Sequence, residues 1–149
     1  MTEATTTELR VGDVVSLGPR RMTRERMRWY CDALETAAER DGNFVVAEPT
    51  IHSDDDFALA QGLPGIIADG MLSTNYLSSL LYRHFGVDYL AGGELDTKFI
   101  RPVYEDEIID AFAKVVGDEG GMVELEVWCE TSEGRTCTVG RASVRRSAA

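Results

Sequence analysis

The chain has 149 residues, the length of one ordinary domain. Its 26 Asp and Glu residues outnumber 15 Lys and Arg residues, and the net charge of −11 argues against a nucleic acid backbone or an anionic membrane surface as the main partner. The hydrophobic fraction of 44% suffices for a core, and no segment approaches the ~20 consecutive apolar residues of a membrane span.

Residues 1–9 are expected to be a frayed tail before a domain that spans residues 10–145. The tail has neither the basic region nor the apolar region of a signal peptide, which favours a cytoplasmic protein. The three cysteines, Cys31, Cys129 and Cys137, are odd in number and widely spaced, and the sequence has no CxxC pair. We therefore expect core thiols, without a disulfide framework or a zinc site.

The first part of the domain predicts helices and loops after one short strand, Val14–Leu17. Thr23 is a candidate N-cap, and apolar residues recur after it at helical spacing. These residues are Met27, Tyr30, Cys31, Leu34 and Ala38. Asp41-Gly42-Asn43 is expected to end this helix, and a short apolar run, Phe44–Val46, follows.

Two further helices are predicted in this half. Ser53 can cap a short helix over Asp54–Gln61, whose first turn carries three aspartates that suit the helix dipole. The helix predicted over Gly70–Phe85 has a wide apolar stripe and should be largely buried. The stripe consists of Leu72, Tyr76, Leu77, Leu80, Leu81 and Phe85. Gly86 ends this helix, and residues 86–93 are expected to form a loop.

Alternating apolar and polar residues predict four consecutive strands in the second half. The strands lie near Glu94–Arg101, Ile109–Val115, Val123–Cys129 and Thr136–Val144. Gly-containing turns connect the last three strands, which indicates antiparallel hairpins. Because the apolar face of these strands needs a cover, the predicted architecture is α+β: a single curved antiparallel sheet wrapped around the Gly70–Phe85 helix.

Two histidines are the first candidates for proton transfer near neutral pH. His84 occupies the last turn of the central helix beside Arg83, where a cation suits the helix C-terminus, so a structural role is favoured. His52 lies in a loop, where functional residues gather, although its position alone does not separate a functional from a structural histidine.

Asp69 and Gly70 stand at the start of the central helix, whose first N–H groups have no partner within the helix. Such N–H groups can form an oxyanion hole, and Gly70 lets a substrate approach the backbone. The alternative interpretation is structural: Asp69 is simply the N-cap of the helix, and Gly70 avoids a steric clash at the helix start. Ser78, about two turns further, can face a site or simply bond back to a helical carbonyl. Arg101 can reach a phosphate or carboxylate, or form a surface ion pair.

Three segments of the chain carry a combined motif. They are Ile51-His52-Ser53-Asp54, Ile67-Ala68-Asp69-Gly70-Met71-Leu72 and Lys98-Phe99-Ile100-Arg101-Pro102-Val103. Together they resemble the N-P-x-H-x-D loop, the A-H-G-M helix start and the F-x-R-P-V strand of the MaoC-like hydratases and dehydratases, the hot-dog-fold group of (R)-specific enoyl-CoA hydratases. Gly70 follows His52 by eighteen residues, the usual interval in this family.

The resemblance implies a hot-dog fold and a lyase that hydrates an enoyl thioester, or dehydrates a β-hydroxyacyl thioester, on coenzyme A or a carrier protein. It implies that His52 is the catalytic acid and base, that the Gly70 N–H polarises the thioester carbonyl, and that Ser78 supports the catalytic loop by a hydrogen bond. It further implies a homodimer or another paired hot-dog oligomer, and neither a metal nor a redox cofactor.

The chain departs from the family at the catalytic aspartate, which usually lies five residues before the histidine and is Ala47 here. Glu48 is one candidate for the missing carboxylate if the loop register shifts. Asp69, which replaces the histidine of A-H-G, is the preferred candidate because it adjoins the expected carbonyl site. Three interpretations stay open: the hydratase, another elimination, isomerisation or cyclisation on the same scaffold, and a non-catalytic subunit of a hetero-oligomer.

Overall fold

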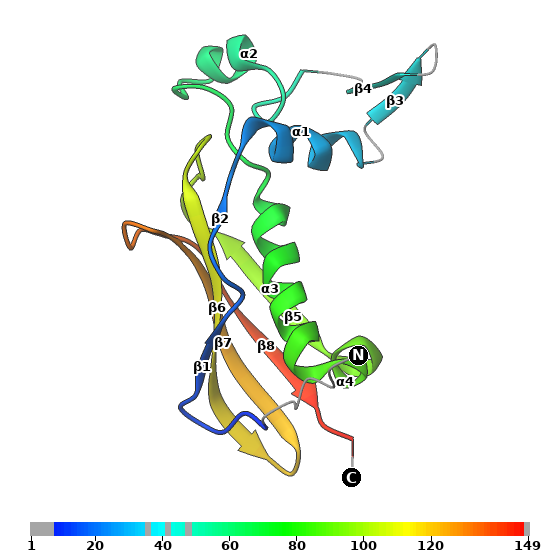
Figure 1. Cartoon of the computed structure of the whole chain (residues 1–149), viewed down its shortest axis with the longest axis vertical. Helices are drawn as coiled ribbons and strands as arrows, with labels where there is room; N and C mark the ends of the chain where they lie inside the picture. Colours follow the sequence, from blue (N-terminus) through cyan, green and yellow to red (C-terminus); the bar gives the residue numbers. More distant parts are fainter. Residues whose placement is uncertain (1–7, 35–36, 41–42, 47–48, 148–149) are drawn as a thin grey trace.

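Six strands form one antiparallel sheet that curves around a long helix, α3 (Gly70–Phe85) (Figure 1). The computed structural model describes residues 8–34, 37–40, 43–46 and 49–147. The strands of this sheet are β1 (Val14–Ser16), β2 (Arg20–Arg21), β5 (Glu94–Phe99), β6 (Ile108–Glu119), β7 (Met122–Thr131) and β8 (Thr136–Arg145). Their order is β1-β6-β7-β8-β5, and β2 also pairs with β6, so that β5 lies at one edge.

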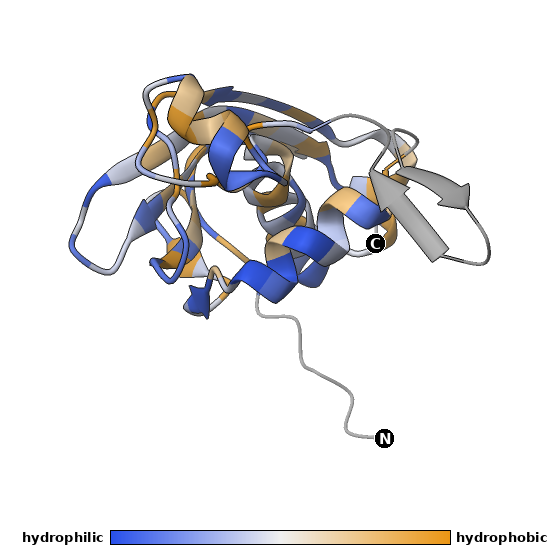
Figure 2. Cartoon of the chain, turned by 90° about the horizontal axis from the view of Figure 1, so that it is seen from above, coloured by the Kyte–Doolittle hydropathy of each residue, from blue (hydrophilic) through white to orange (hydrophobic). Residues whose placement is uncertain are grey.

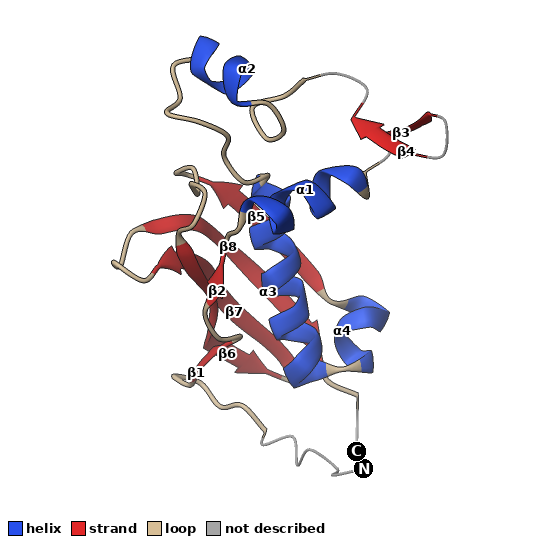
Figure 3. Cartoon of the chain, turned by 45° about the horizontal axis from the view of Figure 1, so that its top comes forward, coloured by secondary structure: helices blue, strands red, loops and turns tan. Residues whose placement is uncertain are grey.

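The other helices are α1 (Arg24–Asp32), α2 (Asp55–Ala60) and α4 (Val87–Gly92). Figure 3 shows α3 along one face of the sheet with α4 near its C-terminal end, while α1 and α2 lie beyond its N-terminal end. Figure 2 shows α1 as a mostly hydrophilic helix, and only Met27 and Cys31 are buried on it. None of the helices in the described part of the chain has the length and hydrophobicity that a membrane span requires.

The core lies between α3 and the inner face of the sheet. The side chains that β6 and β7 contribute to it are each at most 2% exposed. They are Ile109, Ala111, Ala113, Val115, Val123, Leu125, Val127 and Cys129. Leu77, Leu80 and Leu81 of α3 are at most 1% exposed and belong to the same cluster. This alternation confirms the strands predicted from alternating apolar and polar residues, and burial of both layers stabilises the α+β arrangement.

The cysteines are core thiols, as the sequence predicts. All three are free and buried. The Cys129 thiol donates to the carbonyl of Ser73 over 3.7 Å, and the Cys137 thiol donates to the carbonyl of Cys129 over 3.2 Å. Burial raises the pKa of both thiols, so they stay protonated and unreactive at neutral pH.

The segment after α1 differs from the continuous helix that the sequence predicts. The helix ends at Asp32 rather than Ala38, and β3 (Ala37–Arg40) pairs with β4 (Asn43–Val46) in a separate two-stranded sheet. Arg40 and Asn43 are partners in this pairing, and the sequence between them is Asp-Gly. That dipeptide favours a two-residue hairpin connection as much as it disfavours a helix, which explains the wrong prediction.

Two boundaries also differ from the prediction. The N-cap of α2 is Asp54, whose carboxylate accepts from the Phe57 N–H at 2.7 Å, and Ser53 instead accepts from the Thr50 N–H. Residues 87–92 form α4 rather than a loop. Gly86, with a φ of 53°, lets the chain turn from α3 directly into α4.

Candidate active site

An open cavity of about 580 Å³ lies at the N-terminal end of α3. Residues from four separate segments line it: the 51–52 loop, the 61–73 segment that includes the start of α3, the 99–103 segment that begins at the last residue of β5, and Thr138 of β8. Most of its surface is apolar, with a histidine, an aspartate and an arginine among the lining side chains. A concave apolar site with a few polar groups is the usual form of a small-molecule site.

His52 is held in one orientation by hydrogen bonds to its ring and its backbone. Its Nδ1 lies 2.9 Å from the carbonyl oxygen of Ile67, and because a carbonyl can only accept, Nδ1 carries the hydrogen. The neutral ring therefore has its lone pair on Nε2, which makes that atom available as a base. The His52 N–H donates to Thr50 Oγ1 at 3.1 Å, and its carbonyl accepts from Cys31 Sγ at 3.9 Å.

Asp69 uses its two carboxylate oxygens in different ways. Oδ1 accepts from the Met71 N–H at 2.8 Å and so caps α3, while Oδ2 lies 4.0 Å from His52 Nε2. The side chains of His52 and Asp69 are 26% and 22% exposed, so the pair is accessible from the cavity yet partly shielded from bulk water. The base nitrogen of His52 and a carboxylate oxygen thus face each other across a short gap.

Tyr30 and Cys31 of α1 lie close to this carboxylate. Burial, and next the negative charge of Asp69, raise the pKa of both groups above their usual values. The Tyr30 hydroxyl accepts a long hydrogen bond from the Asn75 amide of α3, at 3.5 Å. The part of α1 near the start of α3 therefore contributes groups that remain neutral at neutral pH.

Gly70 is the first residue of α3, and among the described residues its N–H has no acceptor. A Cβ at this position would lie 2.5 Å from the nearest atom of the Phe99 ring, so the ring packs directly against the glycine backbone. Phe99 is itself 47% exposed and lines the cavity. Only glycine allows this packing, and it leaves an unpartnered N–H at the positive end of the helix dipole.

The structure brings three of the candidate residues together: His52, Asp69 and Gly70 line the same cavity. Ser78 lies apart from it, because eight residues of helix carry it about 12 Å along the axis from Gly70. Its hydroxyl accepts from Tyr89 of α4 at 2.9 Å, and the loop-supporting role that the resemblance implies stays a prediction. Ala47 and Glu48 lie outside the described residues.

Two buried hydroxyl residues of the cavity wall were not selected from the sequence. Ser73 is 3% exposed and lies one turn into α3, and its only signal was its place in a polar stripe on an apolar helix. Thr138 is 2% exposed and comes from β8, where it pairs with Phe99. Its position depends on the register of two strands that are far apart in the chain, so no local pattern could predict it.

Comparisons with known proteins agree with this geometry. The family model of the MaoC-like domain matches residues 49–134, which include every residue that lines the cavity except Thr138. No curated protein matches the sequence. The chain is thus similar to this family over more than half of its length.

Several solved structures resemble the whole chain. An unliganded R-hydratase from Pseudomonas aeruginosa has 18% identity and a TM-score of 0.73, over 95% of this chain and 84% of that chain. An (R)-hydratase from A. caviae involved in PHA biosynthesis has 22% identity and a TM-score of 0.72, and the match covers 93% of this chain and 98% of that chain. A chain of the ChsH1-ChsH2 complex from Mycobacterium tuberculosis has 16% identity and a TM-score of 0.70, and the match covers 92% of this chain and 98% of that chain. At these identities the likeness shows the fold, and the hot-dog fold expected from the sequence is confirmed.

Proposed function

Because the chain belongs to the MaoC-like domain family, we propose that it is a hydro-lyase that adds water to, or removes water from, an acyl thioester carried on coenzyme A or a carrier protein. The observation that carries this proposal is the cavity at the start of α3. It holds a histidine with its lone pair on Nε2, a carboxylate oxygen 4.0 Å from that nitrogen, and the Gly70 N–H, which has no acceptor among the described residues. The R-hydratases with similar structures support the same reaction class.

In the hydration direction the Gly70 N–H donates to the thioester carbonyl oxygen and stabilises the negative charge that develops there. A water molecule can hydrogen-bond to both His52 Nε2 and Asp69 Oδ2, since two atoms 4.0 Å apart share points that lie within ~2.8 Å of each. His52 Nε2 removes a proton from this water as its oxygen attacks the β-carbon of the enoyl group. The imidazolium then returns the proton to the α-carbon, so one water adds across the double bond.

Asp69 takes the place of the carboxylate that the family usually has at the position of Ala47. Its Oδ2 orients the attacking water and offsets the charge of the imidazolium while the enolate exists. We prefer it to Glu48 because it borders both the base and the N–H group that receives the carbonyl. None of these steps requires a metal or a redox cofactor.

The first test follows the conjugated thioester absorbance of a short enoyl-CoA after the protein is added. We expect the absorbance to fall, and His52→Ala to reduce the rate by about 10²-fold to 10⁴-fold, because the group that takes the proton from the attacking water is lost. His84→Ala is the matched control, since it removes the other histidine of the chain at a position outside the cavity. No turnover by the folded wild-type protein would contradict the proposal and favour another substrate or a partner chain.

Asp69→Asn tests the second group of the pair. Asparagine is as good an N-cap as aspartate, so the thermal unfolding midpoint should hardly change. The hydration rate should nevertheless fall by about 10²-fold, because the neutral amide lacks the negative charge that orients the water and offsets the imidazolium. A variant with the full rate would show that the carboxylate is supplied from elsewhere, and Glu48→Gln would then be the next variant to measure.

A further inference from the structure

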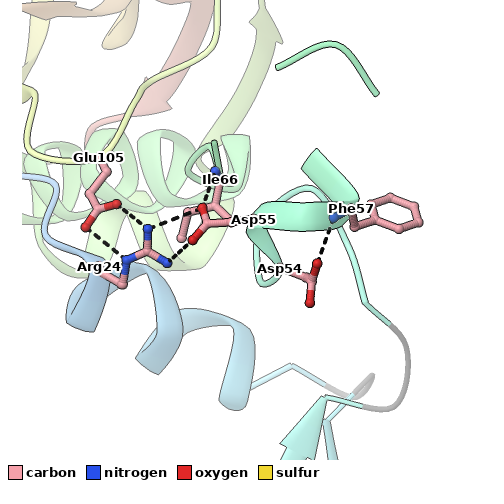
Figure 4. Close-up of polar contacts among 6 residues, drawn as sticks. All are labelled: Arg24, Asp54, Asp55, Phe57, Ile66 and Glu105. Atoms are coloured by element: carbon pink, nitrogen blue, oxygen red, sulfur yellow. Dashed lines mark hydrogen bonds and ion pairs between the residues drawn. The ribbon is translucent and has the colours of Figure 1, made fainter. Parts of the chain in front are cut away.

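We propose that Arg24 is a positioning residue for the His52–Asp69 pair and acts through Asp55. The inference rests on the proposed function and names a group outside the three motif segments. Figure 4 shows the arrangement: Arg24 from α1 lies between Asp55 of α2 and Glu105 of the loop before β6. It is thus the point at which three separate parts of the chain are joined.

The Arg24 guanidinium forms bidentate hydrogen bonds with two carboxylates at once. Nη1 and Nη2 donate to the two oxygens of Asp55 at 2.8 and 3.3 Å, and Nε and Nη2 donate to the two oxygens of Glu105 at 3.0 and 2.5 Å. Such double bidentate pairing uses the rigid geometry of a guanidinium, which a lysine cannot reproduce. It fixes the rotamer of the Asp55 carboxylate.

The Asp55 carboxylate in turn holds the segment that orients His52. Its Oδ1 also accepts from the Ile66 N–H at 3.1 Å, and the carbonyl of the next residue, Ile67, accepts from His52 Nδ1 at 2.9 Å. The Ile67 N–H donates to the carbonyl of Ile51 at 3.0 Å. Three hydrogen bonds therefore join the 51–55 segment to Ile66 and Ile67, and Asp69 follows two residues later.

This ion pair contributes to position more than to stability. The Arg24 and Asp55 side chains are 42% and 45% exposed, and exposed pairs add little to the free energy of unfolding. Arg24 also keeps the pKa of Asp55 below its usual value, so the carboxylate stays charged as the acceptor for Ile66. Loss of Arg24 should therefore leave the protein folded while the His52 ring gains freedom to turn.

The test compares Arg24→Gln, Asp55→Asn and the double variant with the wild-type chain. Arg28→Gln is the matched control, because it makes the same change one turn further along α1, where the side chain is exposed and outside the cavity. The first readout is the ¹⁵N chemical shifts of the imidazole nitrogens, with His52→Ala to assign the two histidines. We expect one protonated Nδ1 in the wild type and the control, and a mixture of tautomers in the Arg24 and Asp55 variants.

The second readout is enoyl-CoA hydration. Each single variant should lose about tenfold to 100-fold in kcat with little change in KM, since misplacement of the base affects the chemical step more than binding. The double variant should be no slower than either single variant, because both remove the same restraint. Unchanged imidazole shifts in Arg24→Gln, or additive losses in the double variant, would overturn the inference. If the wild type does not turn over enoyl-CoA, the proposed function fails while the imidazole shifts still decide the positioning role.

Discussion

Gly70 occupies a position where any side chain would collide with an aromatic ring. We predict that Gly70→Ala lowers the free energy of unfolding by about 1–3 kcal/mol, because its Cβ would lie 2.5 Å from the nearest atom of Phe99. Urea denaturation measures this change. The double variant with Phe99→Ala should be less destabilised than the sum of the two single variants, since the collision is then absent. Additive effects would show that the helix start moves instead of the ring.

His84 is the residue whose titration should be visible in the stability of the protein. Burial, and next the charge of Arg83, lower its pKa below the usual value of 6.5. The unfolded chain therefore binds a proton on His84 before the folded chain does, and stability is lost as the pH falls through this range. The free energy of unfolding should therefore be lower at about pH 5 than at about pH 8, and we predict that this difference is smaller in His84→Gln than in the wild type. Urea denaturation at both pH values measures the difference. An unchanged loss would assign the pH dependence to other groups.

At the scale of elements, Ser78 and Tyr89 join α3 to α4 through one hydrogen bond of 2.9 Å. Ser78→Ala should therefore cost about 1 kcal/mol of unfolding free energy and leave enoyl-CoA hydration unchanged. Ser79→Ala, at the next and exposed position of α3, is the control and should change neither quantity. A loss of activity without a loss of stability in Ser78→Ala would instead support the loop-holding role that the family resemblance implied.

The elements that could be predicted from the sequence are those whose signals agree with one another. α3 begins and ends where expected, because an N-cap at Asp69, a wide apolar stripe and Gly86 all mark the same helix. The hairpin after α1 could not be predicted, since its Asp-Gly signal fits a helix end equally well.

The same contrast holds for the site. His52, Asp69 and Gly70 are found by motif and spacing, and the cavity brings them together. Thr138 and the contacts of Arg24 depend on how distant segments pack, and a linear pattern carries no such information. Ser78 is a different case, because its role comes from residue type and spacing alone, and the partner that the structure shows for its hydroxyl is Tyr89 of α4.

At the scale of the whole molecule, one edge of the sheet has the features of an interface between chains. β5 is the edge strand next to β8, and edge strands present unpaired backbone groups. Val87 and Leu90 of α4 are 76% and 68% exposed, and Phe99 and Ile100 at the end of β5 are also exposed. We therefore predict that two copies of the chain associate through β5 and α4.

Native mass spectrometry of the purified chain tests this association. We predict a homodimer for the wild type and a largely monomeric Leu90→Glu variant, because a charge buried in an apolar interface without a partner is costly. Leu59→Glu makes the same change at a position that is 55% exposed on α2, an element outside the proposed interface, and this variant should remain dimeric. If Leu90→Glu is still a dimer, the interface lies on another surface. If the wild type itself is an inactive monomer, adding candidate hot-dog partner chains to the hydration assay distinguishes a missing partner from another substrate.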